Sequence, residues 1–123
     1  MSVLHVEGHA HLEATLLDVE KAIRHLDGAQ HTLVLVELSS GETITVGGGP
    51  RRFVVELAES TTDRWCVVDP TEGEHPIELV VGGSLAGYPA RLCVDLDVAL
   101  EAALTFVSRR GARSARLVWS QET

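Results

Sequence analysis

Five short runs rich in β-branched residues and leucine crowd the middle of the chain, and the brief connections between them constrain the fold most. Residues 59–63 separate the third and fourth runs, and residues 69–76 separate the fourth and fifth. Parallel strands need a crossover of about a dozen residues or more, usually a helix. Connections this short therefore predict antiparallel pairing in a meander. The five runs are residues 32–38, 43–46, 52–58, 64–68 and 77–81.

Amphipathic segments on either side of these runs predict two helices. Thr15 and Asp18 stand as in a capping box, and Gly28 lies where a left-handed C-cap is expected. The second helix is expected to begin after Asp95 and to end before Gly111. In both segments apolar residues recur at steps of three and four. The stripes are Leu12, Leu16, Val19, Ile23 and Leu26, then Leu96, Ala99, Leu100, Ala103, Phe106 and Val107.

The remaining segments complete the expected fold. Residues 47–50 and 82–89 are rich in glycine and proline, which pack poorly in strands, so both are interpreted as loops. Residues 116–119 predict a last strand, whose partner in the sheet stays open. The chain has 123 residues, which suits one domain over residues 1–123. We expect an α+β fold, with a single mostly antiparallel sheet of about five to seven strands and two helices packed on one face.

The charge balance narrows the choice of partner. The chain carries 18 acidic and 10 basic side chains, for a formal net charge of -8. Residues 60–101 hold eight acids and two arginines, whereas residues 102–123 hold one acid and four arginines. Nucleic-acid binding needs a cationic footprint, and a membrane span needs a longer apolar stretch, so neither is expected. The composition favours a basic protein partner, although acidic surfaces also serve solubility alone.

No residue pattern points to catalysis, a metal ion or a cofactor. His9 and His11, with His5 nearby, lack a third well-spaced ligand, so a solvated N-terminal segment is the favoured interpretation. Cys66 and Cys93 have apolar neighbours, which raise a thiol pKa and favour buried, reduced cysteines. The glycine runs carry neither a P-loop lysine nor the full G-x-G-x-x-G spacing.

Carboxylates are the one abundant functional group, and several of them lie in or beside the last two connections of the predicted meander. Turns of this composition keep carboxylates hydrated, which disfavours a general acid–base pair. Two interpretations stay open: a solvated acidic rim, or a docking surface for a cationic partner, with a tryptophan as anchor or core residue. The candidate partner-binding residues are Asp63, Trp65, Asp69, Glu72, Glu74 and Glu78.

Several motifs in residues 31–121 together carry a family resemblance. They are the hairpin ending in Gly47-Gly48-Gly49, the strand of residues 64–69, the Gly82-Gly83 loop, Tyr88-Pro89, the Ala-rich helix and the closing residues 117–120. In this order they resemble the first numbered family of immunity proteins from bacterial polymorphic toxin systems, often paired with deaminase toxins. The chain departs from that family at Ser120, where a glutamate usually follows the closing tryptophan.

The resemblance implies a non-enzymatic inhibitor that binds a cognate secreted toxin domain and covers its active site. An acidic protein can mimic the charge of a polyanionic substrate. A small acidic secretion-type chaperone that binds an effector segment is the alternative, and a small enzyme or ligand-binding domain is a third. A chaperone is expected to be an obligate homodimer, whereas an inhibitor can be a monomer or a weak dimer. The N-terminal residues resemble no secretory signal, which favours the cytoplasm.

Overall fold

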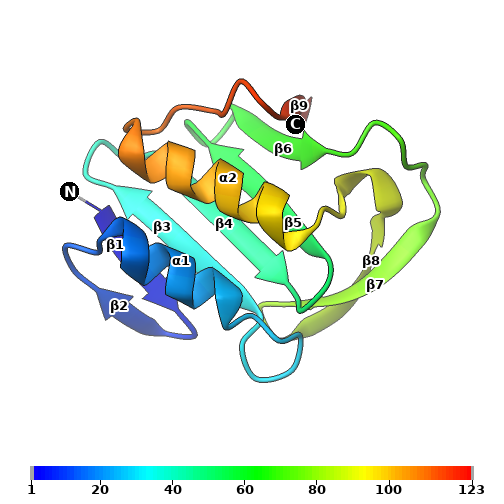
Figure 1. The fold of residues 1–123 in the computed structure, drawn as a ribbon, viewed down its shortest axis with the longest axis horizontal. Coiled ribbons are helices and arrows are strands. Elements are labelled where there is room, and N and C mark those ends of the chain that lie inside the picture. Colours follow the sequence, from blue (N-terminus) through cyan, green and yellow to red (C-terminus); the bar gives the residue numbers. More distant parts are fainter. Residues whose placement is uncertain (1, 123) are drawn as a thin grey trace.

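The computed structural model describes residues 2–122 as one seven-stranded sheet, a separate two-stranded hairpin and two α-helices (Figure 1). The large sheet has the order β2-β1-β3-β4-β5-β6-β9, and every pairing is antiparallel. The predicted α+β class is therefore confirmed. The elements are β1 (Ser2–Val6), β2 (His9–His11), α1 (Leu16–Arg24), β3 (Leu33–Leu38), β4 (Thr43–Gly48), β5 (Phe53–Ala58), β6 (Arg64–Val68), β7 (Pro76–Val81), β8 (Ser84–Pro89), a 3-10 turn η1 (Ala90–Leu92), α2 (Leu96–Ser108) and β9 (Val118–Glu122).

Both helices lie side by side on one face of the large sheet and pack against each other (Figure 1). The sheet meets them with alternate residues, among which Phe53, Val55 and Leu57 of β5 are fully buried. Ile23 of α1 and Phe106 of α2 close the core from the helical side. Because strand side chains alternate between the two faces, the intervening residues of the same strands point away from the helices.

Side-chain caps set where both helices begin, as the sequence predicted. The Thr15 hydroxyl accepts a hydrogen bond from the Asp18 amide at 3.2 Å, and the Asp18 carboxylate accepts one from the Thr15 amide at 2.8 Å. At the start of α2, the Asp95 carboxylate accepts a bond from the Val98 amide at 2.9 Å. These bonds satisfy amides that have no partner within the helix, and so the polar sequence signals and the observed boundaries agree.

The first predicted apolar stripe runs beyond the helix at both ends, although its last residue, Leu26, is buried in the core. The helix ends at Arg24 with His25 as its C-cap, so Gly28 lies in the following loop and is not the cap. The Asp27 carboxylate closes that loop early by accepting bonds from three successive amides, those of residues 29, 30 and 31. Leu12 precedes the capping box and is 68% exposed, because the helix begins only after Thr15.

Three segments that were interpreted as loops or solvated chain form strands. The N-terminal segment forms β1, which pairs with β3, and β2 beyond it. Gly47 and Gly48 continue β4 and pair with Val54 and Phe53 of β5, because a glycine keeps both backbone hydrogen-bonding groups. Residues 84–89 form β8, which pairs with β7 along its whole length.

The meander ends at β6, one strand earlier than predicted. β7 pairs with β8, and β9 takes the edge position beside β6. A short connection excludes a parallel crossover, but it does not require that the next strand join the same sheet. The segment between β6 and β7 is long enough to carry β7 away from the edge that β9 occupies.

The β7–β8 hairpin approaches the sheet from the side opposite the helices, and Gly47 makes this approach possible. Gly47 pairs with Val54, whose side chain points away from the helices. A Cβ atom at Gly47 would lie 2.5 Å from Cγ1 of Val81 in β7, far inside van der Waals contact. The absence of a side chain at this strand position therefore lets Val81 pack directly on the sheet.

A buried serine holds the connection between α2 and β9. Ser114 is 4% exposed, and its hydroxyl donates to the Glu101 carboxylate of α2 at 2.6 Å. Its carbonyl accepts a bond from the indole of Trp119 in β9 at 3.0 Å, and Trp119 packs against the core, as predicted. Hydrogen bonds from Ser114 and then from Thr105 hold the pKa of Glu101 below its usual range.

We expect Gly47→Ala to lower the free energy of unfolding by about 1–3 kcal/mol, because the new Cβ overpacks against a stiff β-branched side chain. Adding Val81→Ala should recover part of this loss, because it removes the methyl group that the new Cβ meets. Urea denaturation of the wild type, both single variants and the double variant measures the coupling. Additive effects would show that the two residues do not meet.

We expect Ser114→Ala to lower the free energy of unfolding at pH 7 by about 1–3 kcal/mol, because it removes the buried hydroxyl that donates to the Glu101 carboxylate and accepts a hydrogen bond from the Arg116 amide. The pKa of Glu101 is lowered in the folded state, so its contribution is present above the ordinary value of 4.5 and is lost as the pH falls through the folded value. The difference between wild type and variant should shrink on acidification. Urea denaturation at pH 7 and pH 3 tests this, with Ser108→Ala as the exposed control.

Candidate protein-binding surface

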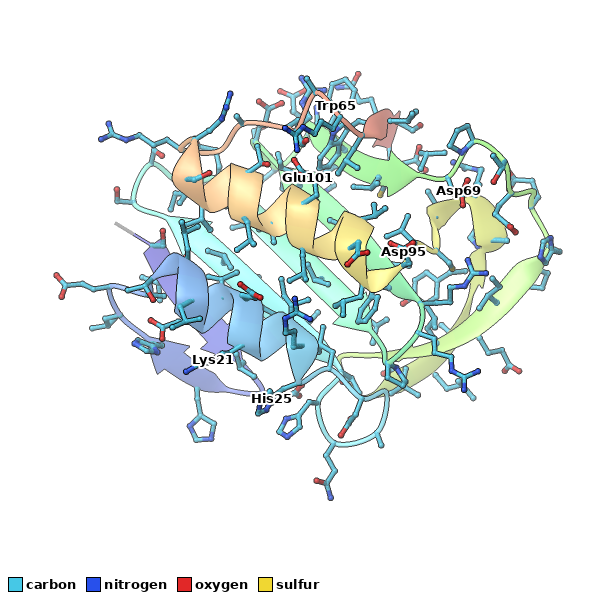
Figure 2. All side chains as sticks on the ribbon, in the orientation of Figure 1. Lys21, His25, Trp65, Asp69, Asp95 and Glu101 are labelled. Carbon is cyan, nitrogen blue, oxygen red and sulfur yellow. The ribbon has the colours of Figure 1, made fainter. Side chains whose placement is uncertain are left out.

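The sequence-predicted acids occupy two separate places. Asp63 precedes β6 and Asp69 follows it, so about 20 Å of extended chain separates them. Figure 2 shows Asp69 beside η1, away from Trp65. Asp63 instead lies near β9, where the side-chain amide of Gln121 donates a hydrogen bond to the Asp63 carboxylate at 3.3 Å. The docking surface expected from the sequence is therefore not one continuous cluster.

The loop of residues 69–75 carries more of the predicted acids than the region around Asp63, and backbone hydrogen bonds to η1 hold this loop in place. The Asp69 amide donates to the Arg91 carbonyl at 2.7 Å, and the Arg91 amide donates to the Gly73 carbonyl at 2.9 Å. Within the loop the Asp69 carboxylate accepts bonds from the Thr71 hydroxyl and amide, which lowers the pKa of Asp69. Hydrogen bonds therefore fix the backbone at Asp69, at Gly73 and in the turn between them. The loop thus presents its glutamates on a defined backbone.

Arg91 joins the acidic loop to the edge of the sheet. Its Nε donates to the Glu74 carboxylate, and its Nη2 lies 3.7 Å from the Glu122 carboxylate of β9. The hydrogen bond from Arg91 to Glu74 raises the pKa of the guanidinium. Glu78 lies on β7, only two residues beyond the strand's first residue, and is exposed. Asp69, Glu72, Glu74 and Glu78 therefore follow one another along the loop and the adjoining strand, whereas Asp63 stands apart.

Trp65 lies on the helical side of the sheet, because it shares that side of β6 with the buried Val67. Its indole Nε1 donates to the Glu59 carboxylate at 3.1 Å, and the Arg113 guanidinium stacks over its ring at 3.7 Å from the centroid. The ring is half-buried. It therefore belongs to a different surface from the acidic loop, next to the arginine-rich segment that follows α2.

A groove opens between the large sheet and the β7–β8 hairpin, and the sequence analysis missed it. Its volume is about 350 Å³. Alternation along β5 and β6 is a signal that could have suggested a second sheet face, but the cover over that face comes from the β7–β8 hairpin, and β8 was interpreted as a loop. Its lining includes the apolar side chains of Val54, Val81, Tyr88 and Leu92 and the polar side chains of Thr45, Glu56, Cys66 and Glu122.

The two cysteines are free thiols with raised pKa values, as predicted, but only Cys93 is buried, whereas Cys66 is half-buried. Burial, followed by the charges of Glu56 and Glu122, raises the pKa of Cys66 to about 11. Burial also raises the pKa of Cys93, which lies in the protein interior. Both thiols are therefore protonated at neutral pH and are poor nucleophiles.

The described residues hold no organised metal centre. Within residues 2–122, no group of three or more histidine, cysteine, aspartate or glutamate side chains is placed to hold a metal ion. His9 and His11 lie exposed on β2, and His11 is 3.6 Å from Asp18. In the same part of the chain, neither helix has the length and apolar character of a membrane span.

These features define a small antiparallel α+β domain with both helices on one sheet face and a groove beneath the β7–β8 hairpin on the other. Comparison of the sequence with models of known protein families places this domain among the immunity proteins. The family described as Immunity protein Imm1 matches residues 7–121, nearly the whole chain. The chain therefore belongs to the Imm1 family, as the resemblance implied. A search among curated proteins found no match.

We expect Cys66 to react with iodoacetamide at pH 8 about a hundred times more slowly than an unperturbed cysteine, because its pKa of about 11 leaves little thiolate. Glu56→Gln and Glu122→Gln should each accelerate labelling, because each removes a negative charge that disfavours the thiolate. Mass spectrometry of the labelled protein over time gives the rate, and Cys66→Ser gives the background from Cys93. Equal rates in wild type and both variants would contradict the electrostatic coupling.

Proposed function

We propose that this immunity protein neutralises a cognate toxin that acts on nucleic acid, such as a deaminase, by occluding the toxin's active site with an acidic surface. The single observation that carries the proposal is the family match over residues 7–121, because members of this family are immunity proteins. The match favours this function over a secretion-type chaperone. The protein makes and breaks no covalent bond in this role and needs no cofactor.

The charge of the chain supports a nucleic-acid-targeting toxin as the partner. An enzyme that holds a polyanionic substrate presents basic groups around its active site. This chain has a formal net charge of -8, so its field attracts such a surface and speeds the encounter. Binding in the cytoplasm of the producing cell would protect that cell's own nucleic acids.

The geometry supports the loop of residues 69–75 as part of the contact. Asp69, Glu72, Glu74 and Glu78 lie in succession on a backbone that hydrogen bonds to η1 hold in place. A standard interface buries about 800 Å² per partner, which is roughly an eighth of the 6866 Å² accessible surface of this protein.

The first test uses the toxin domain encoded beside the gene of this protein. Co-purification of the two proteins should give a stable complex, and titration with the immunity protein should abolish the toxin's nucleic-acid-modifying activity at one equivalent. A bound complex in which the toxin stays fully active would contradict occlusion of the active site. Failure to bind any neighbouring toxin domain would contradict the function itself.

We expect neutralisation of three acids, Glu72→Gln, Glu74→Gln and Glu78→Gln, to lower the association rate constant for the toxin by about tenfold or more and to weaken its dependence on salt. Stopped-flow fluorescence at several ionic strengths gives both quantities.

The matched control is the triple variant Glu13→Gln, Glu20→Gln and Asp97→Asn, which changes the net charge equally at residues in or just before the two helices. It should keep most of the wild-type association rate. Equal effects of the two triple variants would assign the attraction to net charge and would remove the acidic loop from the contact surface.

A further inference from the structure

A basic stretch follows α2 in a chain whose acidic side chains outnumber its lysines and arginines by 18 to 10. No acidic residue occurs between Glu101 and Glu122. All four arginines of this stretch are exposed, so they form a basic surface on an acidic protein. The proposed acidic contact does not involve them. They are Arg109, Arg110, Arg113 and Arg116, and we call residues 109–116 the arginine segment.

Most of the charge of the arginine segment has no partner within the described chain. Within residues 2–122, Arg109, Arg110 and Arg113 form no ion pair. Arg116 approaches the Glu101 carboxylate at 3.9 Å, which is too long for a hydrogen bond. Neighbouring charges of one sign repel each other. The arginine segment therefore keeps an unsatisfied attraction for anionic groups outside the chain.

Hydrogen bonds and packing hold the arginine segment in a defined conformation. The Arg109 amide donates to a carbonyl of α2 at 2.9 Å. The hydroxyl of the buried Ser114 accepts a bond from the Arg116 amide at 3.2 Å. The Arg113 guanidinium stacks over the ring of Trp65. Because these groups are already ordered, a partner that binds them loses less conformational entropy.

The arginine segment and the acidic loop meet at one small pocket. This pocket has a volume of about 250 Å³ and lies between the start of α2 and strands β6 and β9. Asp69 lines it from the acidic loop, and Arg116 lines it from the arginine segment. Its apolar lining includes Val118, which is 51% exposed. Charges of opposite sign thus flank an exposed apolar area, as a charged rim flanks the centre of a protein interface.

A single partner can reach both charged areas. Trp65, over which Arg113 stacks, and Asp69 are four residues apart along β6 and its end. This separation corresponds to about 13 Å of extended chain. A standard interface of about 800 Å² per partner is about 30 Å across. The acidic loop and the arginine segment therefore fit within one interface.

We propose that Arg109, Arg110 and Arg113 bind carboxylates on the toxin, beside the active site that the acidic loop faces. The proposal rests on the proposed function, because it assigns a second contact with the same partner. Two contacts of opposite sign fix the orientation in which the toxin docks, because a rotated toxin would bring like charges together. A guanidinium suits this role because its planar fork bonds both oxygens of a carboxylate.

The surroundings of the arginines favour protein carboxylates over a nucleic acid. The net charge of -8 repels a polyanion, whose binding needs a more extensive cationic footprint. A short acidic segment of a protein carries only a few charges, which three arginines can match. Tryptophan and arginine, which Trp65 and Arg113 supply here, are also enriched among the residues that dominate binding energy at protein interfaces.

The test measures the equilibrium dissociation constant of the toxin domain encoded beside the gene, by isothermal titration calorimetry. The triple variant Arg109→Gln/Arg110→Gln/Arg113→Gln should bind about tenfold or more weakly than wild type, the effect of losing three exposed ion pairs. This variant carries three fewer positive charges, so attraction by net charge alone predicts tighter binding. The sign of the change therefore separates the two explanations.

The matched control is the triple variant Lys21→Gln/Arg24→Gln/Arg51→Gln, which changes the net charge equally at exposed residues outside the arginine segment. It should bind the toxin as tightly as wild type or more tightly, because the protein becomes more acidic.

A double variant guards against an effect on folding. Arg109→Gln/Arg110→Gln leaves the stack of Arg113 on Trp65 in place and should still bind the toxin about threefold or more weakly than wild type. Thermal unfolding confirms that each variant is folded.

The toxin's side of the contact is found by amide substitution of its surface carboxylates. At least one such variant should show a loss that is not additive with the triple variant of the arginine segment. If the toxin binds wild type tightly and the arginine variants equally or more tightly, the arginine segment is not a contact, although the immunity function stands.

Two measurements on the protein alone would also overturn the assignment to toxin carboxylates. One is binding of a short single-stranded DNA oligonucleotide that the triple variant of the arginine segment abolishes. The other is self-association in sedimentation velocity that the same variant abolishes, which would assign the arginines to the acidic loop of a second copy. If wild type binds no toxin domain, the proposed function fails, and this proposal fails with it.

Discussion

The antiparallel register between β4, β5 and β6 is the constraint on which the rest of the structure depends. It places Val55 and Leu57 against the helices and, by the period of two, places Val54 and Glu56 on the opposite side. The same register that builds the core therefore builds the floor of the groove. A slip by one residue would exchange the two sets, bury Glu56 and expose Leu57.

The acidity of the protein is distributed by local structure and not by sequence proximity. Asp69 is engaged with Thr71, and Glu74 is paired with Arg91. Glu56 and Glu122 come together at the groove although they lie far apart in the chain. A count of charges along the sequence therefore gives the net charge of the protein, whereas the charged groups that meet in space depend on which strands are neighbours.

Local signals predicted the elements whose physics is local. The Thr15–Asp18 capping box and the Asp95 cap were found because a side chain and an amide three residues apart suffice to form them. β8 was missed because its residues, Ser84 to Pro89, have little intrinsic strand propensity and gain their structure from β7. The interpretation of Gly47 as a loop residue failed for a related reason: its role is to make room for Val81, a contact that no local pattern encodes.

The sequence by itself determined the α+β class, the antiparallel pairing, the caps and the acidic character, because each depends on spacing, connection length or composition. Only the tertiary structure decided that Asp63 and Trp65 lie apart from the acidic loop, that β9 closes the sheet beside β6, and that two distant glutamates share a groove. These outcomes depend on contacts between residues far apart in the chain, which form as the sheet, the helices and the hairpin bury apolar surface against one another.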